Sequence, residues 1–380
     1  MASINLQGDT SGSISISAPS VAGSNTLTLP ATTQTLATQN SLGVRNLIIN
    51  GDMRIAQRGT SATGVTNNYA TCDRFLIRNN NLGAFTITQD TNAPDGFGNS
   101  LKWDCTTADA SPAAGDFAIL QYRAEGQDLQ QLAFGTPSAK QFTVSFWVKS
   151  SETGTAVFRI AATNSGNVMQ GHTYTISSAN TWEKKTITFT ANTSDVIPND
   201  NLIGFNLYWY LATGTDRTSG TLPTTTWEAY LTANEAVGQT INIAASTSSY
   251  FNITGVQLEV GTEATPFEHR PYDMELQRCM RYCQQYQYYG CGTGGGSGGS
   301  VPVTTTQFRV PMRATPTVAW ISGGVAGDGN YSRTITGLNF TSNINPTGAT
   351  FGYTITGGSL TTQNVGVVVQ YAVMKFDAEL

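Results

Sequence analysis

Short segments of alternating apolar and polar residues, separated by turn residues, occupy the chain from residue 44 to about residue 270. In the most regular of them, QFTVSFWVKSS, successive side chains point to opposite sides of a predicted strand. Phe142, Val144, Phe146 and Val148 lie on one side, and Thr143, Ser145, Trp147 and Lys149 lie on the other. Such segments, with no helix-length amphipathic pattern between them, are typical of a β-sandwich or jelly roll. The pattern predicts an all-β protein whose largest domain is a jelly roll at residues 44–270.

Residues 1–43 form a leader of mostly small and polar residues. Alternation at Ile14 and Ile16, and again at Leu27 and Leu29, predicts short strands. Too few large apolar side chains accompany these positions to close a core. We therefore expect the leader to dock or trimerise, packing either on copies of itself around a three-fold axis or on another protein.

The period of the pattern changes at residues 271–289, PYDMELQRCMRYCQQYQYY. Leu276, Cys279, Cys283 and Tyr286 recur at a spacing of three to four residues, which predicts one short helix. The helix is too brief for a stable solitary coiled coil, but these side chains fit the a and d positions of a three-stranded one. We therefore expect the four side chains to form the neck of a homotrimer.

Glycine dominates residues 290–300, GCGTGGGSGGS, and this composition is typical of a flexible linker. Alternating segments return at residues 301–380 and predict a small C-terminal β domain. Two of its loops, SGGVAGDGNYSR and NFTSNINPTGATFGY, carry aromatic, amide and guanidinium groups that suit sugar binding at a distal tip. The candidate residues in these loops are Tyr331, Arg333, Asn343 and Tyr353.

Charge is sparse along the chain: charged residues make up 12% of it, and 20 Lys and Arg stand against 25 Asp and Glu. Because no basic block is present, nucleic acid is not expected as a partner. Neither a secretory signal pattern nor a run of 18 apolar residues occurs, so membrane insertion is not expected either. A polar but weakly charged surface is typical of extracellular or virion proteins, and a virion protein leaves its host by lysis.

The sequence predicts no catalytic site. Five carboxylates are candidates for a glycosidase pair, but no pattern in the sequence pairs them: Asp52, Asp73, Asp104, Glu125 and Glu228. The sequence also lacks the motifs of serine hydrolases, phosphate loops and zinc helices. Its five cysteines and two histidines do not have the spacing of a metal site, so we expect buried free thiols and no metal.

Aromatic and amide side chains on two predicted strands are candidates for glycan binding. Trp147 falls on the outward side of the predicted strand QFTVSFWVKSS, and Asn206, Tyr208 and Tyr210 fall on the outward side of LIGFNLYWYLA. Flat aromatic faces stack on the apolar patches of sugars, while amides bond their hydroxyls. The alternative is that these aromatic residues pack under loops or against a neighbouring subunit. Trp182, in the segment TWEKKTITFTA, is expected in the core.

Three segments carry a resemblance to a class of proteins: NLIINGDMRIAQRGTS, YATCDRF and ITGVQLEVGTEATPFEHRPYDMELQRCMRYCQQY. Together they resemble the central part of tail-fibre and other virion proteins of tailed bacteriophages, and GDTSGSISISAPSVAGSNTLTLP resembles the leader of such proteins. The resemblance implies a fibre that attaches to the tail through its N-terminus and binds a glycan or protein of the host surface. A capsid decoration or head fibre without a receptor role is the alternative, and a polysaccharide depolymerase is a lesser one.

The framing strands are also similar to the jelly-roll carbohydrate-binding modules attached to xylanases. The matching positions open, cross and close the domain: Asn50, Gly51 and Met53, then Trp147 and Lys149, then Gln257, Leu258 and Glu259. The resemblance implies a structural calcium whose acidic ligands are here Arg54 and, approximately, Thr254. Because a guanidinium cannot coordinate a cation, no calcium is expected at this position.

Overall fold

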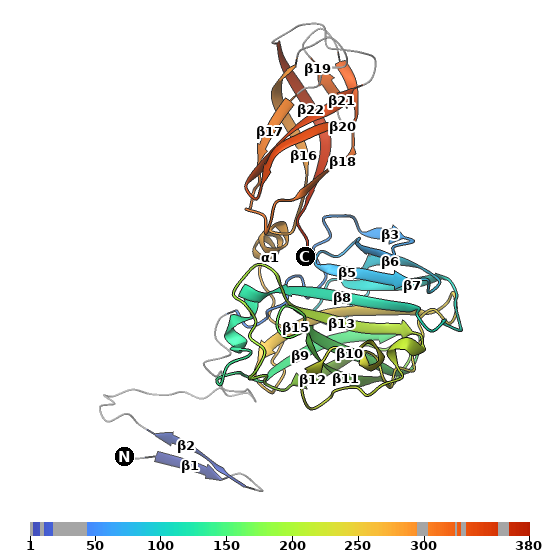
Figure 1. Ribbon diagram of the computed structural model, residues 1–380, viewed down its shortest axis with the longest axis vertical. Helices are drawn as coiled ribbons and strands as arrows, with labels where there is room; N and C mark the ends of the chain where they lie inside the picture. Colours follow the sequence, from blue (N-terminus) through green and yellow to red (C-terminus); the bar gives the residue numbers. More distant parts are fainter. Residues whose placement is uncertain are drawn as a thin grey trace. The chain divides into compact units, whose positions relative to one another are not determined.

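The computed structural model describes residues 3–7, 11–17, 44–294, 303–323, 325–327, 332–355 and 365–380. The chain divides into two compact units, Met1–Leu42 and Gly43–Leu380. In the first unit, β1 (Ser3–Gln7) and β2 (Ser13–Ser17) pair as an antiparallel hairpin (Figure 1). The strand predicted around Ile14 and Ile16 is therefore confirmed, whereas Leu27 and Leu29 lie outside the described residues.

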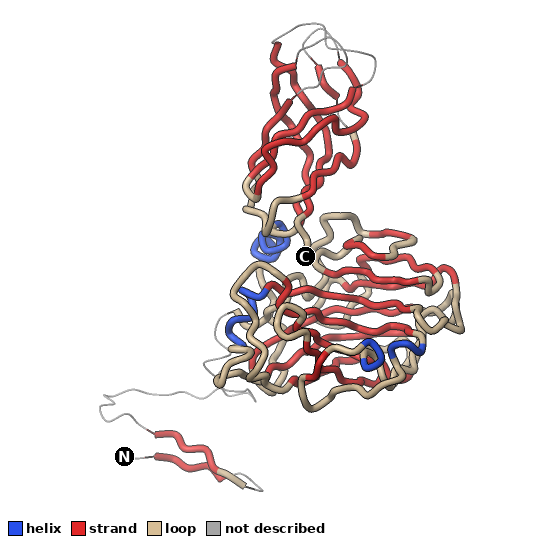
Figure 2. Tube along the Cα trace, viewed as in Figure 1, coloured by secondary structure: helices blue, strands red, loops and turns tan. Residues whose placement is uncertain are grey.

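Two antiparallel sheets form a sandwich in the second unit, and strands dominate its trace (Figure 2). The six-stranded sheet runs, in order, β12 (Glu183–Phe189), β9 (Phe142–Ser150), β15 (Tyr250–Val260), β7 (Ser100–Thr107), β6 (Ala84–Asp90) and β3 (Ser61–Thr63). The seven-stranded sheet runs β14 (Glu228–Ala229), β11 (Val168–Ile176), β10 (Gly154–Ala162), β13 (Ile203–Thr213), β8 (Phe117–Glu125), β5 (Phe75–Asn80) and β4 (Asn67–Tyr69). The predicted all-β, jelly-roll class is confirmed.

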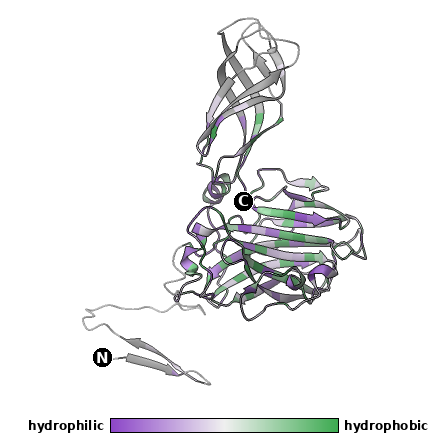
Figure 3. Ribbon diagram, viewed as in Figure 1, coloured by the Kyte–Doolittle hydropathy of each residue, from purple (hydrophilic) through white to green (hydrophobic). Residues whose placement is uncertain are grey.

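The core lies between the two sheets and consists largely of aromatic and branched side chains. Phe146 of β9 packs edge-on against Trp209 of β13, with ring centroids 5.7 Å apart, and Phe158 of β10 lies 4.7 Å from the same indole ring. Figure 3 shows hydrophobic positions recurring along these strands. The inward assignment of the apolar positions of β9 is confirmed because all four are fully buried: Phe142, Val144, Phe146 and Val148.

Trp182 is not part of this core, contrary to the prediction. The residue precedes the first residue of β12 and is only half-buried. Its indole Nε1 donates a hydrogen bond to Asn92 Oδ1 at 3.1 Å in an exposed position. The alternation of inward and outward side chains therefore does not extend to Trp182. Its indole lies at the protein surface beside the first residue of β12.

The opening segment of the domain, residues 46–55, forms a hydrogen-bonded turn around Asn50, whose backbone is left-handed with φ 60°. Its side-chain amide accepts a hydrogen bond from the Ile55 amide at 2.9 Å and donates to the Ile55 carbonyl at 2.8 Å. The next residue, Gly51, lies against β15, where its carbonyl accepts a hydrogen bond from the Val256 amide at 2.9 Å. A Cβ at Gly51 would lie 2.1 Å from the Val256 carbonyl oxygen, so only glycine fits there.

The predicted helix at 271–289 is shorter in the structure. Helix α1 spans Tyr272–Met280, and Cys283 is the first residue of strand β16 (Cys283–Gly294). From residue 284 onward, apolar side chains recur at a spacing of two residues as well as at three to four. Pairing with a neighbouring strand selects the spacing of two, which is that of a strand. Residues 290–294 are therefore strand rather than linker, and residues 295–300 lie outside the described part.

The apolar face of α1 is buried within the chain. Cys279 packs with Ile49, Ile55 and Tyr282, and Leu276 packs against the same cluster. Cys283 is also fully buried, whereas nothing is described of the Tyr286 side chain. The chain itself therefore covers Cys279 and Cys283, which cannot form a trimer neck, whereas a neck at the half-buried Leu276 and at Tyr286 stays a prediction.

The remaining strands close a small antiparallel barrel. The order is β16, β17 (Val303–Gln307), β21 (Gly348–Ile355), β20 (Ser332–Asn345), β19 (Val325–Gly327), β22 (Val365–Asp377) and β18 (Thr317–Ser322). An additional pairing of β16 with β22 completes the ring. The C-terminal domain is β-structured as predicted, but its first strand begins at Cys283. Among the described residues, no helix has the length and apolarity needed to span a membrane.

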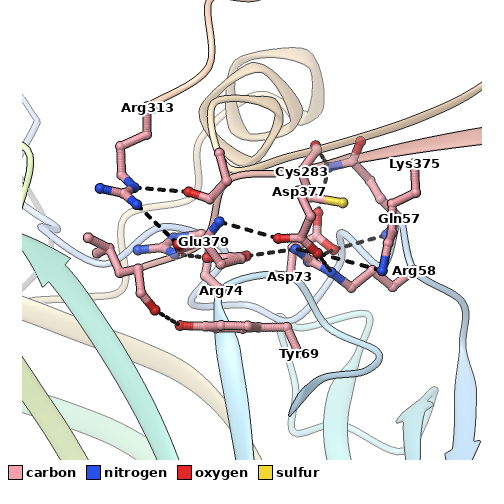
Figure 4. Close-up of polar contacts among 12 residues, drawn as sticks. Gln57, Arg58, Tyr69, Asp73, Arg74, Cys283, Arg313, Lys375, Asp377 and Glu379 are labelled. Carbon is pink, nitrogen blue, oxygen red and sulfur yellow. Dashed lines mark hydrogen bonds and ion pairs between the residues drawn. The ribbon is translucent and has the colours of Figure 1, made fainter. Parts of the chain in front are cut away.

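A buried ionic cluster joins the end of β22 to the sandwich (Figure 4). Arg58 Nη2 lies 3.1 Å from both Asp377 Oδ2 and Glu379 Oε1, and its Nη1 lies 3.4 Å from Asp73 Oδ1. Arg74, whose side chain is fully buried, pairs with the Glu379 carboxylate. The Arg74 guanidinium carbon also lies 3.4 Å from the centre of the Tyr282 ring.

Backbone groups of the last residues complete this junction. Arg313 donates to the carbonyls of Ala378 at 2.9 Å and Glu379 at 3.1 Å. Arg123 and the Tyr69 hydroxyl both donate to the Leu380 carbonyl. Because these contacts cross from the barrel to the sandwich, removing β17 to β22 would also strip the sandwich of the partners of Arg58 and Arg74.

We expect Gly51→Ala to destabilise the sandwich by about 2–3 kcal/mol, because the new methyl group overlaps the backbone of β15. Gly98→Ala is the matched control, since a Cβ at Gly98 meets nothing within 4 Å. Urea unfolding of the two variants and the wild type measures the difference. Equal free energies of unfolding for the two variants would contradict the close approach.

Burial raises the pKa of Asp73 to about 7, whereas an unfolded Asp titrates near about 4. Between these values the folded protein retains a proton that the unfolded chain has released, so raising the pH favours unfolding. The contribution of Asp73 is thus present below about pH 4 and is lost as the pH rises through about 7.

Asp73→Asn mimics the protonated carboxyl, and we expect its free energy of unfolding to lack this loss between pH 5 and pH 7. Urea unfolding at several pH values measures the difference between the free energies of unfolding of wild type and variant. The contributions of the other titrating groups cancel in this difference. A constant difference across this range would show that Asp73 is ionised in the folded protein.

Candidate functional site

The outer face of the seven-stranded sheet holds three of the predicted glycan-binding residues. Asn206, Tyr208 and Tyr210 of β13 point away from the core, as predicted from the alternation with Phe205 and Trp209, which are fully buried in it. They are not exposed, however: Tyr208 is 8% and Tyr210 0% accessible. The connection between β13 and β15, which includes η3 (Thr215–Arg217) and η4 (Thr232–Asn234), covers this face.

A buried arginine lies among tyrosines beneath this covering connection. The guanidinium carbon of Arg159, on β10, is 4.3 Å from the ring centre of Tyr208 and 5.4 Å from that of Tyr230. Its Nη2 donates to the Tyr210 hydroxyl at 2.9 Å and pairs with Glu235 Oε1 at 3.1 Å. The cation therefore sits over ring faces and has one carboxylate partner, which suits a desolvated guanidinium.

Glu235 ties the covering connection to the sheet. Besides Arg159, its carboxylate accepts a hydrogen bond from the Tyr230 hydroxyl at 2.6 Å and pairs with Arg217 Nε at 2.9 Å. Burial raises the pKa of Tyr210 and of Tyr230, so both remain neutral phenols near neutral pH. Tyr230 thus donates a hydrogen bond through its hydroxyl, while the residue as a whole is 38% exposed.

A cavity of about 190 Å³ opens between the covering connection and the sheet; we call it the outer-face cleft. It is smaller than the roughly 300 Å³ typical of drug-sized ligand sites, so it suits one small polar group or a single sugar ring. Three of its rim residues are exposed: Thr163, Asn167 and Tyr230. The other lining residues are Arg78, Phe117, Ile119, Ala161, Tyr208, Tyr210, Arg217 and Glu235.

The predicted glycan-binding residues include Tyr208 and Tyr210, which line the cleft. They do not include its charged lining residues, Arg78, Arg217 and Glu235. One signal was present: Arg159 interrupts the apolar run TAVFRIAA, and a charge within an inner strand requires a partner. Asn206 lies below the rim, where its amide donates to Thr163 Oγ1 at 3.0 Å. It therefore positions a rim hydroxyl rather than lining the cleft.

Trp147 is not brought together with these residues, because β9 belongs to the other sheet. Its outward position is as predicted, and the side chain is half-buried. It flanks Gly255, whose φ of 62° marks the irregularity in β15 between Thr254 and Gln257, with Phe97 on the same glycine. Trp147 therefore covers a bulge on the opposite face of the sandwich.

The candidates in the C-terminal domain are only partly described. Asn343 is exposed on β20 with a left-handed φ of 49°. Arg333 lies on β20 and Tyr353 on β21, but their side chains are not described, and Tyr331 lies outside the described residues. A glycan site at this tip stays a prediction.

The five candidate carboxylates do not gather in the described structure. Asp52 pairs with Arg54, Asp73 with Arg58, Asp104 with Lys102 and Glu125 with Arg281, while Glu228 accepts from Thr226. At the position of the implied calcium, Arg54 pairs with Asp52 at 2.8 Å, and the fully buried Thr254 has no hydrogen-bond partner for its hydroxyl. No cluster of three metal-ligating side chains is found among the described residues.

Four of the predicted free thiols are described, and all four are buried and unpaired: Cys72, Cys105, Cys279 and Cys283. Burial raises the pKa of each of them, most weakly at Cys105, so these sulfurs remain protonated at neutral pH. They act as small apolar side chains of the core.

No family model matches the chain, and no curated protein does. Among solved structures, the chain is similar to the enzymatically active domain of tailspike protein 4 of bacteriophage CBA120, with 11% identity, a TM-score of 0.31 and coverage of 57% of this chain and 21% of that one. A putative sugar-binding protein of Bacteroides thetaiotaomicron has 15% identity and a TM-score of 0.33 over 57% of this chain and all of its own. A family 11 carbohydrate-binding module of a Clostridium thermocellum cellulase has 13% identity and a TM-score of 0.27, with coverage of 58% and 97%.

Proposed function

We propose that the protein is a structural component of a bacteriophage virion, a trimeric tail fibre that attaches through its N-terminal leader and binds host surface glycan without catalysing a reaction. The observation that carries the glycan-binding part is the outer-face cleft. It combines an exposed aromatic ring at Tyr230, an amide at Asn167 and a hydroxyl at Thr163 around one small cavity. An aromatic face with a few convergent polar groups is the arrangement that sugar binding needs.

The trimer and the tail attachment rest on the sequence of the leader and on its resemblance to phage leaders. The segment around helix α1 gives the trimer less support than its sequence did, since Cys279 and Cys283 are buried within the chain. Three copies of a weak glycan site on one fibre would bind a cell surface together through their effective concentration. A small, single-sugar cleft is compatible with such a design, because each site needs only modest affinity.

Variants at the rim of the cleft test glycan binding. We expect Tyr230→Ala and Asn167→Gly to weaken binding to an array of bacterial surface polysaccharides by about tenfold, which corresponds to ~1.4 kcal/mol. Glycine is chosen at residue 167 because the backbone there has φ 51°. Tyr272→Ala is the matched control, since Tyr272 is an exposed tyrosine on α1, outside the cleft lining. Unchanged binding by both rim variants would reject the cleft as the glycan site.

Location and mass test the fibre assignment. We expect antibody-gold labels on intact virions at the tail, and a mass of three chains in light scattering of the purified protein. Labels spread over the capsid would instead support a decoration protein, and a monomer mass at micromolar concentration would reject the trimer. These measurements do not depend on the glycan experiment.

A further inference from the structure

The outer-face cleft has an excess of positive charge. Two guanidiniums, Arg78 and Arg217, line it, and Arg159 lies beneath it. The one carboxylate in the lining is Glu235, which already contacts Arg159, Arg217 and the Tyr230 hydroxyl. The chain as a whole has a net charge of −5, so this local surplus of cations is not a general property of the protein.

Of the two guanidiniums that line the cleft, Arg217 is paired with Glu235, and Arg78 has no charged partner among the described residues. It projects from β5 and is half-buried, with its guanidinium carbon 5.3 Å from the ring centre of Phe117. Its one hydrogen bond within the described structure is a long contact of 3.5 Å from Nη1 to the Gln121 side-chain oxygen. No carboxylate oxygen of a described residue lies within 4.0 Å of it.

The position of Arg78 is fixed by packing rather than by charge. The guanidiniums of Arg78 and Arg217 both lie over Phe117, the latter at 4.2 Å from its ring centre. A guanidinium held in place by a ring keeps most of its donors free, and its planar fork matches the two oxygens of a carboxylate. Because the cation is partly desolvated, such a pair would be stronger than one on an open surface.

We propose that the outer-face cleft selects an acidic sugar, a glycan residue whose carboxylate pairs with Arg78 while its ring lies against Tyr230. This inference rests on the proposed glycan-binding function and narrows its substrate class from sugars in general to uronic acids and related carboxylated sugars. A carboxylate is chosen over a phosphate ester because the cavity, at about 190 Å³, must hold the charged group together with the sugar ring.

The test uses the full chain on an array of bacterial surface polysaccharides, each printed untreated and after chemical reduction of its carboxyl groups to alcohols. We expect binding to carboxylated polysaccharides and at least a tenfold loss on carboxyl reduction. Arg78→Met should show a loss of the same size on the untreated polysaccharides, and Arg78→Lys should recover part of it. Lys184→Met is the charge-matched control, because Lys184 is exposed on β12 of the other sheet.

Salt provides a second readout that a purely structural role of Arg78 would not change. Raising the salt from about 0.05 M to 0.5 M should weaken wild-type binding and leave the residual binding of Arg78→Met nearly constant. Melting temperatures of the variants show whether each is folded, and the Lys variant keeps the test valid if the Met variant is not.

The outcomes separate the two proposals. Equal binding to carboxyl-reduced polysaccharides, with loss of binding in Tyr230→Ala, would overturn the acidic-sugar inference and leave glycan binding intact. Binding that requires phosphate groups, and not carboxyl groups, would overturn it as well. If the wild type binds no polysaccharide on the array, the proposed glycan-binding function fails and the acidic-sugar inference fails with it.

Discussion

The ion pair between Arg159 and Glu235 holds the covering connection on the seven-stranded sheet, and the cleft depends on it. Arg159 is buried on an inner strand, so the loss of Glu235 would leave an unpaired charge, which costs about 3–5 kcal/mol. The same carboxylate orders Tyr230 and Arg217. Folding requires a partner for the buried cation of Arg159. The carboxylate that provides this partner therefore also places the Tyr230 ring and the Arg217 cation at the rim of the cavity.

The alternation of polar and apolar residues was enough to predict the fold class and the orientation of the strands. It placed the apolar residues of β9 inward and Tyr208 and Tyr210 outward, because the period of two is a property of the backbone. It left open whether Tyr208 is exposed or packs under a loop, and in the structure the connection that follows β13 covers it. A large aromatic side chain suits both a buried and an exposed sheet face, and only tertiary contacts decide between them.

The helix α1 shows the limit of a periodic pattern in a short segment. The apolar positions after Met280 satisfy both a period of three to four and a period of two, and the pairing of β16 with β22 selects the strand. The sequence had no means of excluding a trimer neck at Cys279, for a related reason: this side chain packs against Ile49 and Ile55, which belong to the opening segment of the domain. Neither partner lies near the helix in the sequence, so no local pattern could reveal them.

Charge is sparse in this chain, so the places where charged side chains are buried are informative. At the junction with the barrel, Arg58 and Arg74 face Asp73, Asp377 and Glu379, and each of these two guanidiniums has a carboxylate within 4.0 Å. In the outer-face cleft, Arg78 has none among the described residues. A cluster that serves only to hold the fold balances its charges internally, because unpaired buried charge is costly. Arg123 and Arg313 of the junction have no carboxylate partner either, but their donors are taken up by backbone carbonyls. Arg78 makes only a long contact to Gln121, and a guanidinium with free donors on the wall of a cavity is the feature that points to a binding site.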